Sequence, residues 1–299
     1  MENLNEKIKT FIDRSTNEER IIAIKESDFF LHSQAREVLK KLLYLQNHPT
    51  CHRMPNMLLL GDSNNGKTSI LQKHLSMNPT VISENTSEVI VPVILVESPN
   101  EPNEKKFFKN ILNSLNAPYE AQISSDVLQN KAVNRIIKNK VKLMMIDEIH
   151  NVLVGSINKQ RAFLNLIKYL SNTLKISFVC TGTIAAHNAL STDPQLMNRF
   201  HPYKLRRWKA DDEYLRLLAT FEQVLPLKNK SSLTENKTAS KILLLSEGLL
   251  GEISDLIKQS AIYSIENRIE KIDLKVIEKI IEEEIYVPES LRRRRAFIE

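Results

Sequence analysis

The stretch MLLLGDSNNGKTSIL, residues 57–71, decides the fold class of this chain. Its apolar start leads into the pattern G-x4-G-K-T, which begins at Gly61 and ends at Thr68. The short apolar run, stopped by glycine, favours a buried strand over residues 57–60, and a helix is expected over residues 67–76. A strand, this pattern and a helix in succession are typical of a phosphate-binding loop, the Walker A motif. The competing interpretation is an ordinary glycine turn with a lysine present by chance.

The chemistry expected of this loop is the binding of a triphosphate. Backbone N–H groups would surround the β-phosphate, and the N-terminus of the following helix favours its negative charge. Lys67 is expected to reach the β- and γ-phosphates of ATP, and the Thr68 hydroxyl to bind Mg²⁺. The residues expected to bind the nucleotide are Gly61, Asp62, Ser63, Asn64, Asn65, Gly66, Lys67, Thr68 and Ser69.

A second motif follows another apolar run. Residues 143–146 are Leu-Met-Met-Ile, and Asp147 and Glu148 come directly after them, which is the Walker B pattern. Asp147 is expected to hold Mg²⁺ through water, and Glu148 to polarise the attacking water as general base. A strand that simply ends in solvated carboxylates is the alternative, and the position downstream of a P-loop argues against it.

The remaining pattern predicts an α/β protein. Apolar runs alternate with helical patterns, and helical crossovers between buried strands imply a parallel sheet covered by helices on both faces. The predicted strands are residues 57–60, 89–96, 141–146 and 176–180. Strand patterns stop near residue 204 and helical patterns follow, over residues 211–225, 238–247, 252–267 and 274–284. We therefore expect an N-terminal helical extension (1–50), an α/β core (51–207), a small helical lid (208–285) and a basic C-terminal tail (286–299).

Composition narrows the class further. The chain has 299 residues, of which 42% are hydrophobic and 26% charged, as in ordinary soluble globular proteins. It contains no run of roughly 18 apolar residues that could span a membrane and no apolar leader of the secretory kind. Two cysteines, Cys51 and Cys180, do not make a disulfide framework, and we expect a cytoplasmic protein. Cys51 lies near His48 and His52, but zinc sites need four well-spaced ligands, and a polar loop is favoured.

Four stretches together resemble the TniB/TnsC family of transposon-encoded AAA+ ATPases. They are residues 53–68, residues 194–200, residues 205–208 followed by 211–215, and residues 246–253. The resemblance implies a P-loop AAA+ core with a small C-terminal helical lid. It also implies ATP binding and hydrolysis, and assembly as a homo-oligomeric ring or helical filament on double-stranded DNA. Such proteins pass a target site to a DDE transposase, often with a TniQ-like targeting protein.

The resemblance also assigns roles to single residues. Arg199 matches the arginine finger, which would reach the γ-phosphate bound by a neighbouring subunit. A polar residue ending the strand over 176–180 would contact the γ-phosphate or the water, with Thr183 the first choice and Thr181 the second. Many AAA+ lids carry an arginine where this chain has Glu252. An arginine sensor in the lid is therefore in doubt, and slow hydrolysis is expected.

DNA contacts are expected on basic helix faces. The net charge of +6 permits a nucleic-acid partner without requiring one. Lys105, Lys106 and Lys109 begin one predicted helix and are the main candidates for phosphate contacts. A second basic run comprises Lys131, Arg135, Lys138 and Lys140, and the tail contains Arg292–Arg295. Solvated helix faces and a solvated tail remain the alternatives.

The leading hypothesis is therefore an ATP-dependent, DNA-binding regulator of transposition. A replication initiator or helicase loader is the first alternative, although the lid uses the residues that a winged-helix domain would need. An ATP-gated signalling scaffold is the second, although the long C-terminal repeats usual in that class are not found here.

Overall fold

The computed structural model describes residues 2–26, 31–83, 87–120, 122–153, 155–190 and 197–295. Contacts divide these residues into two units. The α/β unit contains residues 34–63 and 67–205, and the helical unit contains the described residues up to Ser33, the short stretch Asn64–Gly66 and those from Arg206 onward. None of the described helices is long and apolar enough to cross a membrane.

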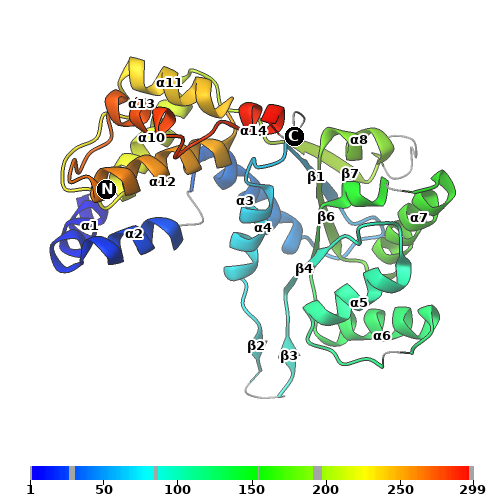
Figure 1. Cartoon of the computed structure of the whole chain (residues 1–299). Coiled ribbons are helices and arrows are strands. Elements are labelled where there is room, and N and C mark those ends of the chain that lie inside the picture. Colours follow the sequence, from blue (N-terminus) through cyan, green and yellow to red (C-terminus); the bar gives the residue numbers. More distant parts are fainter. Residues whose placement is uncertain are drawn as a thin grey trace. The chain divides into compact units, whose positions relative to one another are not determined.

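A parallel sheet forms the centre of the α/β unit (Figure 1). In its described part the strand order is β4 (Val93–Glu97), β5 (Leu143–Asp147), β6 (Ser177–Gly182), β1 (Asn56–Leu60) and β7 (Phe200–Lys204). Every neighbouring pair of these strands is parallel. The carboxyl ends of all five strands therefore meet at one edge of the sheet, and the P-loop starts from this edge.

Helices cover both faces of the sheet, as the sequence pattern predicts. Figure 1 shows α5 (Glu104–Ser114) and α6 (Ser125–Lys138) on one face, and α3 (Ser33–Gln46) and α4 (Lys67–Ser76) on the other. Among the described residues, the helical elements of this unit also include η1 (Ile149–Leu153), α7 (Ile157–Leu174) and α8 (Ile184–Leu190). Because neither face meets water, β1, β5 and β6 are buried along their whole length.

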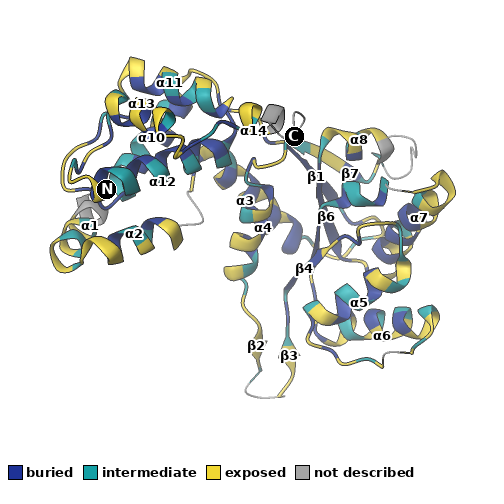
Figure 2. Cartoon of the chain, in the orientation of Figure 1, coloured by how far each residue is buried: buried dark blue, intermediate teal, exposed yellow. Residues whose placement is uncertain are grey.

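The apolar run over residues 89–96 is not one buried strand, which corrects the prediction. It divides into β3 (Val89–Ile90) and β4, and β3 pairs in antiparallel fashion with β2 (Val81–Ile82). Pro92 lies between the two parts, and proline has no N–H to offer a sheet ladder. The carbonyl of Pro92 instead accepts from the N–H groups of Lys142 and Leu143 at 2.9 and 3.2 Å. The β2–β3 ribbon is largely exposed, as Figure 2 shows.

The edge strand β7 is an addition to the four predicted strands. It contains Pro202 and exposed His201, and it pairs with β1 within the described sheet. A proline is tolerated there because an edge strand has one side without a ladder partner. Apolar runs do not predict this strand, because its sequence, FHPYK, is largely polar.

The helical unit packs around its own apolar core. It contains α1 (Glu2–Arg14), α2 (Asn17–Glu26), α10 (Asp212–Val224), α11 (Asn236–Ser246), α12 (Leu250–Glu266), α13 (Leu274–Glu282) and α14 (Glu289–Arg295). Buried Trp208, Phe221 and Ile253 belong to this core. Side-chain caps begin α10 and α13, since Asp211 and Asp273 each accept from a backbone N–H three residues on, at 2.9 and 3.1 Å.

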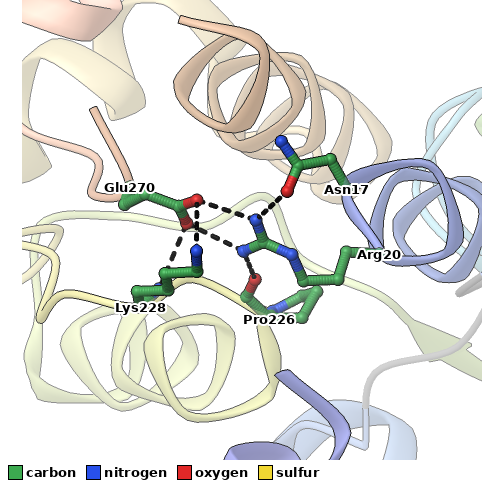
Figure 3. Close-up of polar contacts among 5 residues, drawn as sticks. All are labelled: Asn17, Arg20, Pro226, Lys228 and Glu270. Atoms are coloured by element: carbon green, nitrogen blue, oxygen red, sulfur yellow. Dashed lines mark hydrogen bonds and ion pairs between the residues drawn. The ribbon is translucent and has the colours of Figure 1, made fainter. Parts of the chain in front are cut away.

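A buried ion pair ties α2 to the rest of the helical unit (Figure 3). The side chain of Arg20 is fully buried, and its Nη2 and Nη1 atoms lie 2.7 and 2.8 Å from the two carboxylate oxygens of Glu270. Nη1 also donates to the Pro226 carbonyl at 3.0 Å, and Nη2 to Asn17 Oδ1 at 2.8 Å. This fork geometry satisfies most of the guanidinium donors, which is what allows the charge to be buried.

Part of the predicted basic tail is helical and contacts the rest of the helical unit. Residues Glu289–Arg295 form α14. Arg292 Nη2 lies 2.6 Å from both carboxylate oxygens of the buried Glu252. The Tyr286 hydroxyl donates to the same carboxylate at 2.8 Å. Residues 296–299 of the predicted tail lie outside the described residues.

Candidate nucleotide-binding site

The P-loop leaves β1 at the carboxyl edge of the sheet. The Gly61 N–H donates to the Gly182 carbonyl of β6 at 3.1 Å, which holds the start of the loop against the neighbouring strand. Lys67 is buried at the start of α4, and its Nζ donates to the carbonyls of Gly61 and Asp62 at 3.0 and 2.8 Å. Burial lowers the pKa of Lys67, and the carboxylates of Glu148, Asp147 and Asp62 act in the opposite direction.

The middle of the loop belongs to the helical unit by its contacts. Asn64 and Gly66 both have positive φ angles, 57° and 81°, so the loop turns tightly here. The Asn64 carbonyl accepts from the Gly251 N–H at 2.9 Å, and its side-chain amide donates to Glu252 at 2.9 Å. Glu252 therefore binds Asn64, Tyr286 and Arg292 at the position where many AAA+ lids carry an arginine.

The structure brings the two acidic-motif residues and the P-loop threonine together. Thr68 Oγ1 donates to Asp147 Oδ2 at 2.7 Å, although 79 positions separate the two residues. The other oxygen, Asp147 Oδ1, accepts from the Thr181 hydroxyl and, at 3.0 Å, from the Glu148 N–H. The Asp147 carboxylate is thus held in one orientation at the carboxyl edge of β5.

These oxygens fit a magnesium ion. A hydroxyl and a carboxylate from two different elements meet at 2.7 Å, and Mg²⁺ prefers hard oxygen ligands of this kind. Protein sites commonly supply one or two such ligands and leave the rest to phosphates and water. Thr68 and Asp147 are therefore suited to hold Mg²⁺ beside a triphosphate.

Glu148 has an unusual backbone conformation. Its φ of 56° lies in the left-handed region, which costs a residue with a side chain about 1–2 kcal/mol. The Glu148 N–H donates to Asp147 Oδ1 and to Thr181 Oγ1, at 3.0 and 3.2 Å, so the conformation is fixed by its neighbours. Its carboxylate lies 3.0 Å from His150 Nε2 and is about one third exposed (36%). A strained residue held by such contacts is a common feature of functional sites.

Thr181, rather than Thr183, lies against the acidic pair. Thr181 is fully buried and its hydroxyl binds Asp147, whereas Thr183 is half-buried and its carbonyl accepts from the Ala186 N–H at 3.0 Å. Between them, Gly182 leaves room for close packing, since a Cβ there would lie 2.8 Å from the Ala186 Cβ. The register of β6 beside β5 makes this choice, and the order of residues along the chain does not reveal it.

Arg199 lies at the opposite edge of the sheet. It precedes β7, whose first residue, Phe200, pairs with Asn56 at the amino end of β1. A strand of five residues spans about 17 Å, so the length of β1 separates Arg199 from the P-loop of the same chain. The structure does not bring Arg199 together with Lys67, Asp147 and Glu148.

The predicted DNA-binding lysines lie on α5. Asn110 of this helix donates to the Glu97 carbonyl at 3.0 Å, which anchors α5 at the carboxyl end of β4. Lys109 Nζ lies 5.6 Å from the centre of the Tyr119 ring, whereas Lys106 is exposed and Lys105 is partly buried. In the second basic run, Lys140 pairs with Glu88 at 2.6 Å. Lys131 and Lys138 of the same run are exposed.

A family comparison identifies the chain. The model of the family described as bacterial TniB protein matches residues 20–210, which include both Walker motifs, Thr181 and Arg199. The chain belongs to the TniB family. No curated protein matches it.

Solved structures similar to this TniB protein share its fold. ORC1 of Aeropyrum pernix in complex with DNA is 13% identical with a TM-score of 0.60, and covers 87% of this chain and 68% of its own. ORC2 of Aeropyrum pernix in its ADP form is 14% identical with a TM-score of 0.62, and the match covers 87% of this chain and 71% of the ORC2 chain. Cdc6p of Pyrobaculum aerophilum is 17% identical with a TM-score of 0.56, and the match covers 82% of this chain and 66% of the Cdc6p chain. The TniB chain therefore has the AAA+ fold, with a parallel sheet between helices and a C-terminal group of helices.

Proposed function

We propose that this TniB protein hydrolyses ATP with Mg²⁺ and uses the nucleotide to control its assembly on target DNA. The observation that carries the proposal is the hydrogen bond between Thr68 and Asp147, which joins the P-loop to the acidic strand end. Lys67 and Glu148 flank this pair. A phosphate-binding lysine, two metal ligands and a general base thus share one edge of the sheet.

Each residue has a distinct role in the proposed reaction. The loop N–H groups and Lys67 bind the β- and γ-phosphates, and Lys67 exchanges its carbonyl partners for phosphate oxygens. Mg²⁺ held by Thr68 and Asp147 would neutralise the charge on the phosphates. Glu148 accepts the proton of the attacking water, and Thr181 keeps the Asp147 carboxylate and the Glu148 backbone in place.

Arg199 acts on a neighbouring copy in this proposal. It lies at the amino edge of the sheet, and so it reaches the γ-phosphate only across an interface between two copies. An arginine supplied in this way stabilises the negative charge of the transition state. Hydrolysis then depends on assembly of the homo-oligomer, as a ring or a helical filament.

The biological role that we propose is regulation of DNA transposition. The TniB family match supports it, and the net charge of +6 and the lysines of α5 are compatible with binding to the phosphates of duplex DNA. In this role the ATP-bound oligomer on target DNA recruits or activates a DDE transposase, with a TniQ-like protein as a further partner. Hydrolysis resets the assembly.

The test uses the purified full chain with ATP, Mg²⁺ and duplex DNA. We expect phosphate release that DNA stimulates, and loss of release but not of nucleotide binding in Glu148→Gln. Electron microscopy of Glu148→Gln with ATP and duplex DNA should show rings or filaments on the DNA. A wild-type protein that remains monomeric and ignores both ATP and DNA would refute the proposal.

A role in replication initiation is the second candidate, because the fold is similar to that of ORC1 and Cdc6p structures. The two roles differ in the downstream partner. Stimulation of strand transfer by a DDE transposase from a related element supports transposition, whereas loading of a replicative helicase supports initiation. DNA-stimulated turnover also argues against an ATP-gated signalling scaffold.

A further inference from the structure

A basic cavity lies at the amino edge of the sheet, away from the P-loop. It has a volume of about 460 Å³ and is lined by Arg53, Met54, Pro55, Asn198, Arg199 and His201. Two arginines and a histidine contribute to this lining, and none of the described residues that line it is a carboxylate. Its composition therefore favours an anion.

The backbone around both arginines is held firmly. The Asn56 N–H donates to the Arg199 carbonyl at 3.2 Å, which joins the segment before β1 to the segment before β7. The buried Asn56 side chain accepts from the Phe178 N–H at 2.8 Å. On the other side, Cys51 Sγ donates to the Arg53 carbonyl at 3.0 Å, and the neighbouring Met54 is buried. The two side chains therefore extend from a fixed platform.

The two guanidinium groups have no negative partner among the residues that the structure describes. Arg53 is exposed, and no carboxylate of the described chain forms an ion pair with it or with Arg199. Arg199 Nη1 instead donates to the neutral Asn172 side chain, which orients it. Both arginines line one cavity, and an anion bound there would offset the repulsion between their positive charges.

The position of the cavity determines where this anion comes from. It lies at the amino ends of β1 and β7, about 17 Å of strand away from the P-loop edge, so it cannot serve the nucleotide of its own chain. Planar guanidinium groups bind phosphate oxygens in pairs. The matching chemistry is a phosphate group presented by another molecule.

We propose that Arg53 and Arg199 form a two-arginine site for the γ-phosphate of ATP bound by a second copy of this chain. Arg53 is then a further catalytic residue, since it touches the transferred phosphoryl group beside Arg199. The inference rests on the proposed ATP hydrolysis in an oligomer. The other source of the same chemistry is the DNA backbone, and the cavity is small for a groove that would follow a duplex.

The first measurement is ATP turnover by Arg53→Ala in the full chain with duplex DNA. We expect kcat to fall about tenfold to a hundredfold, short of the largest losses known for a single arginine finger. The dissociation constant for ATP of the isolated protomer should stay unchanged, because the site acts across an interface. Arg161→Ala removes an exposed arginine of α7 and is the matched control, with turnover equal to wild type.

The second measurement is complementation. Lys67→Ala lacks its own phosphate-binding lysine but keeps both arginines, whereas Arg53→Ala keeps its P-loop. When the two are mixed in equal amounts, about a quarter of the head-to-tail interfaces combine an intact P-loop with intact arginines. Turnover should therefore rise well above that of either variant alone.

The outcomes separate the inference from the proposed function. If Arg53→Ala hydrolyses ATP as fast as the wild type, the inference is overturned and the proposed function stands. The same follows if complementation fails, or if Arg53→Ala mainly reduces the salt dependence of DNA binding, since the anion is then a DNA phosphate. If the wild-type protein does not hydrolyse ATP, the proposed function is refuted, and the inference that rests on it is refuted as well. As a stability control, the midpoint temperature of thermal unfolding of Arg53→Ala should equal that of the wild type, because the Arg53 side chain is exposed.

Discussion

Loss of the Glu270 charge should destabilise the helical unit strongly. In Glu270→Gln the side chain keeps its shape, but the Arg20 guanidinium, which is 0% exposed, loses its bidentate carboxylate. Removing one partner of a buried pair costs about 3–5 kcal/mol, because the remaining charge stays buried without compensation. Lys228 Nζ, 3.8 Å from Glu270, adds a smaller and more exposed contribution. We expect the lower end of the range, about 3 kcal/mol.

Urea unfolding measures this loss directly. Trp208 is the only tryptophan of the chain and is buried in the core of the helical unit, so its fluorescence reports on this unit. With a slope of about 1.5 kcal/mol per molar urea, a loss of 3 kcal/mol lowers the midpoint by about 2 M. Glu282→Gln breaks an exposed pair with Lys279 and is the control, with an expected change below about 0.5 kcal/mol.

A paired replacement separates burial from pairing. Arg20→Met combined with Glu270→Leu removes both charges and should recover most of the stability that Glu270→Gln loses, because a well-packed apolar pair often replaces a buried ion pair at little cost. If Glu270→Gln shifts the urea midpoint no more than Glu282→Gln does, the reasoning is refuted. The contact between Arg20 and Glu270 would then contribute little to the free energy of unfolding.

The same pair makes stability depend on acid pH. The hydrogen bond from Arg20 is the main cause that lowers the pKa of Glu270 below its ordinary value of 4.5. A carboxyl group with a lower pKa in the folded state contributes fully above its unfolded pKa, and the contribution disappears as the pH falls through the folded pKa. The difference in stability between wild type and Glu270→Gln should therefore be constant at neutral pH and shrink below about pH 4.5.

Three further substitutions test other parts of the structure. Gly182→Ala places a methyl group 2.8 Å from the Ala186 Cβ and should cost about 1–3 kcal/mol in thermal unfolding, with Ala186→Gly restoring part of the loss. Thr181→Val should reduce ATP turnover much more than Thr183→Val, because only the Thr181 hydroxyl binds Asp147; equal effects would contradict the assignment. Asp273→Ala removes the N-cap of α13 and should cost about 1 kcal/mol by circular dichroism melting, whereas Asp273→Asn should cost little.

Local chemistry explains what could be predicted from the chain alone. The P-loop needs glycine, lysine and threonine at fixed spacing, and Asp147 and Glu148 directly follow an apolar run. Both motifs can therefore be recognised from a few consecutive residues. Apolar runs and helical periodicity likewise predicted β1, β5, β6 and most helices, since burial of one face depends on nearby sequence. Pro92 carried the signal that divides β3 from β4, because a proline rarely continues a strand.

Contacts between distant segments decided the rest. Arg20 and Glu270 are 250 positions apart, and neither looks unusual in its own segment. Strand register alone places Thr181 beside Asp147, and strand order alone places Arg53 beside Arg199 at the edge opposite the P-loop. Register and strand order follow from the packing of the whole sheet, whose side chains alternate faces with each residue. The sequence by itself therefore determined which chemical groups this protein carries, and the tertiary structure determined which of them meet.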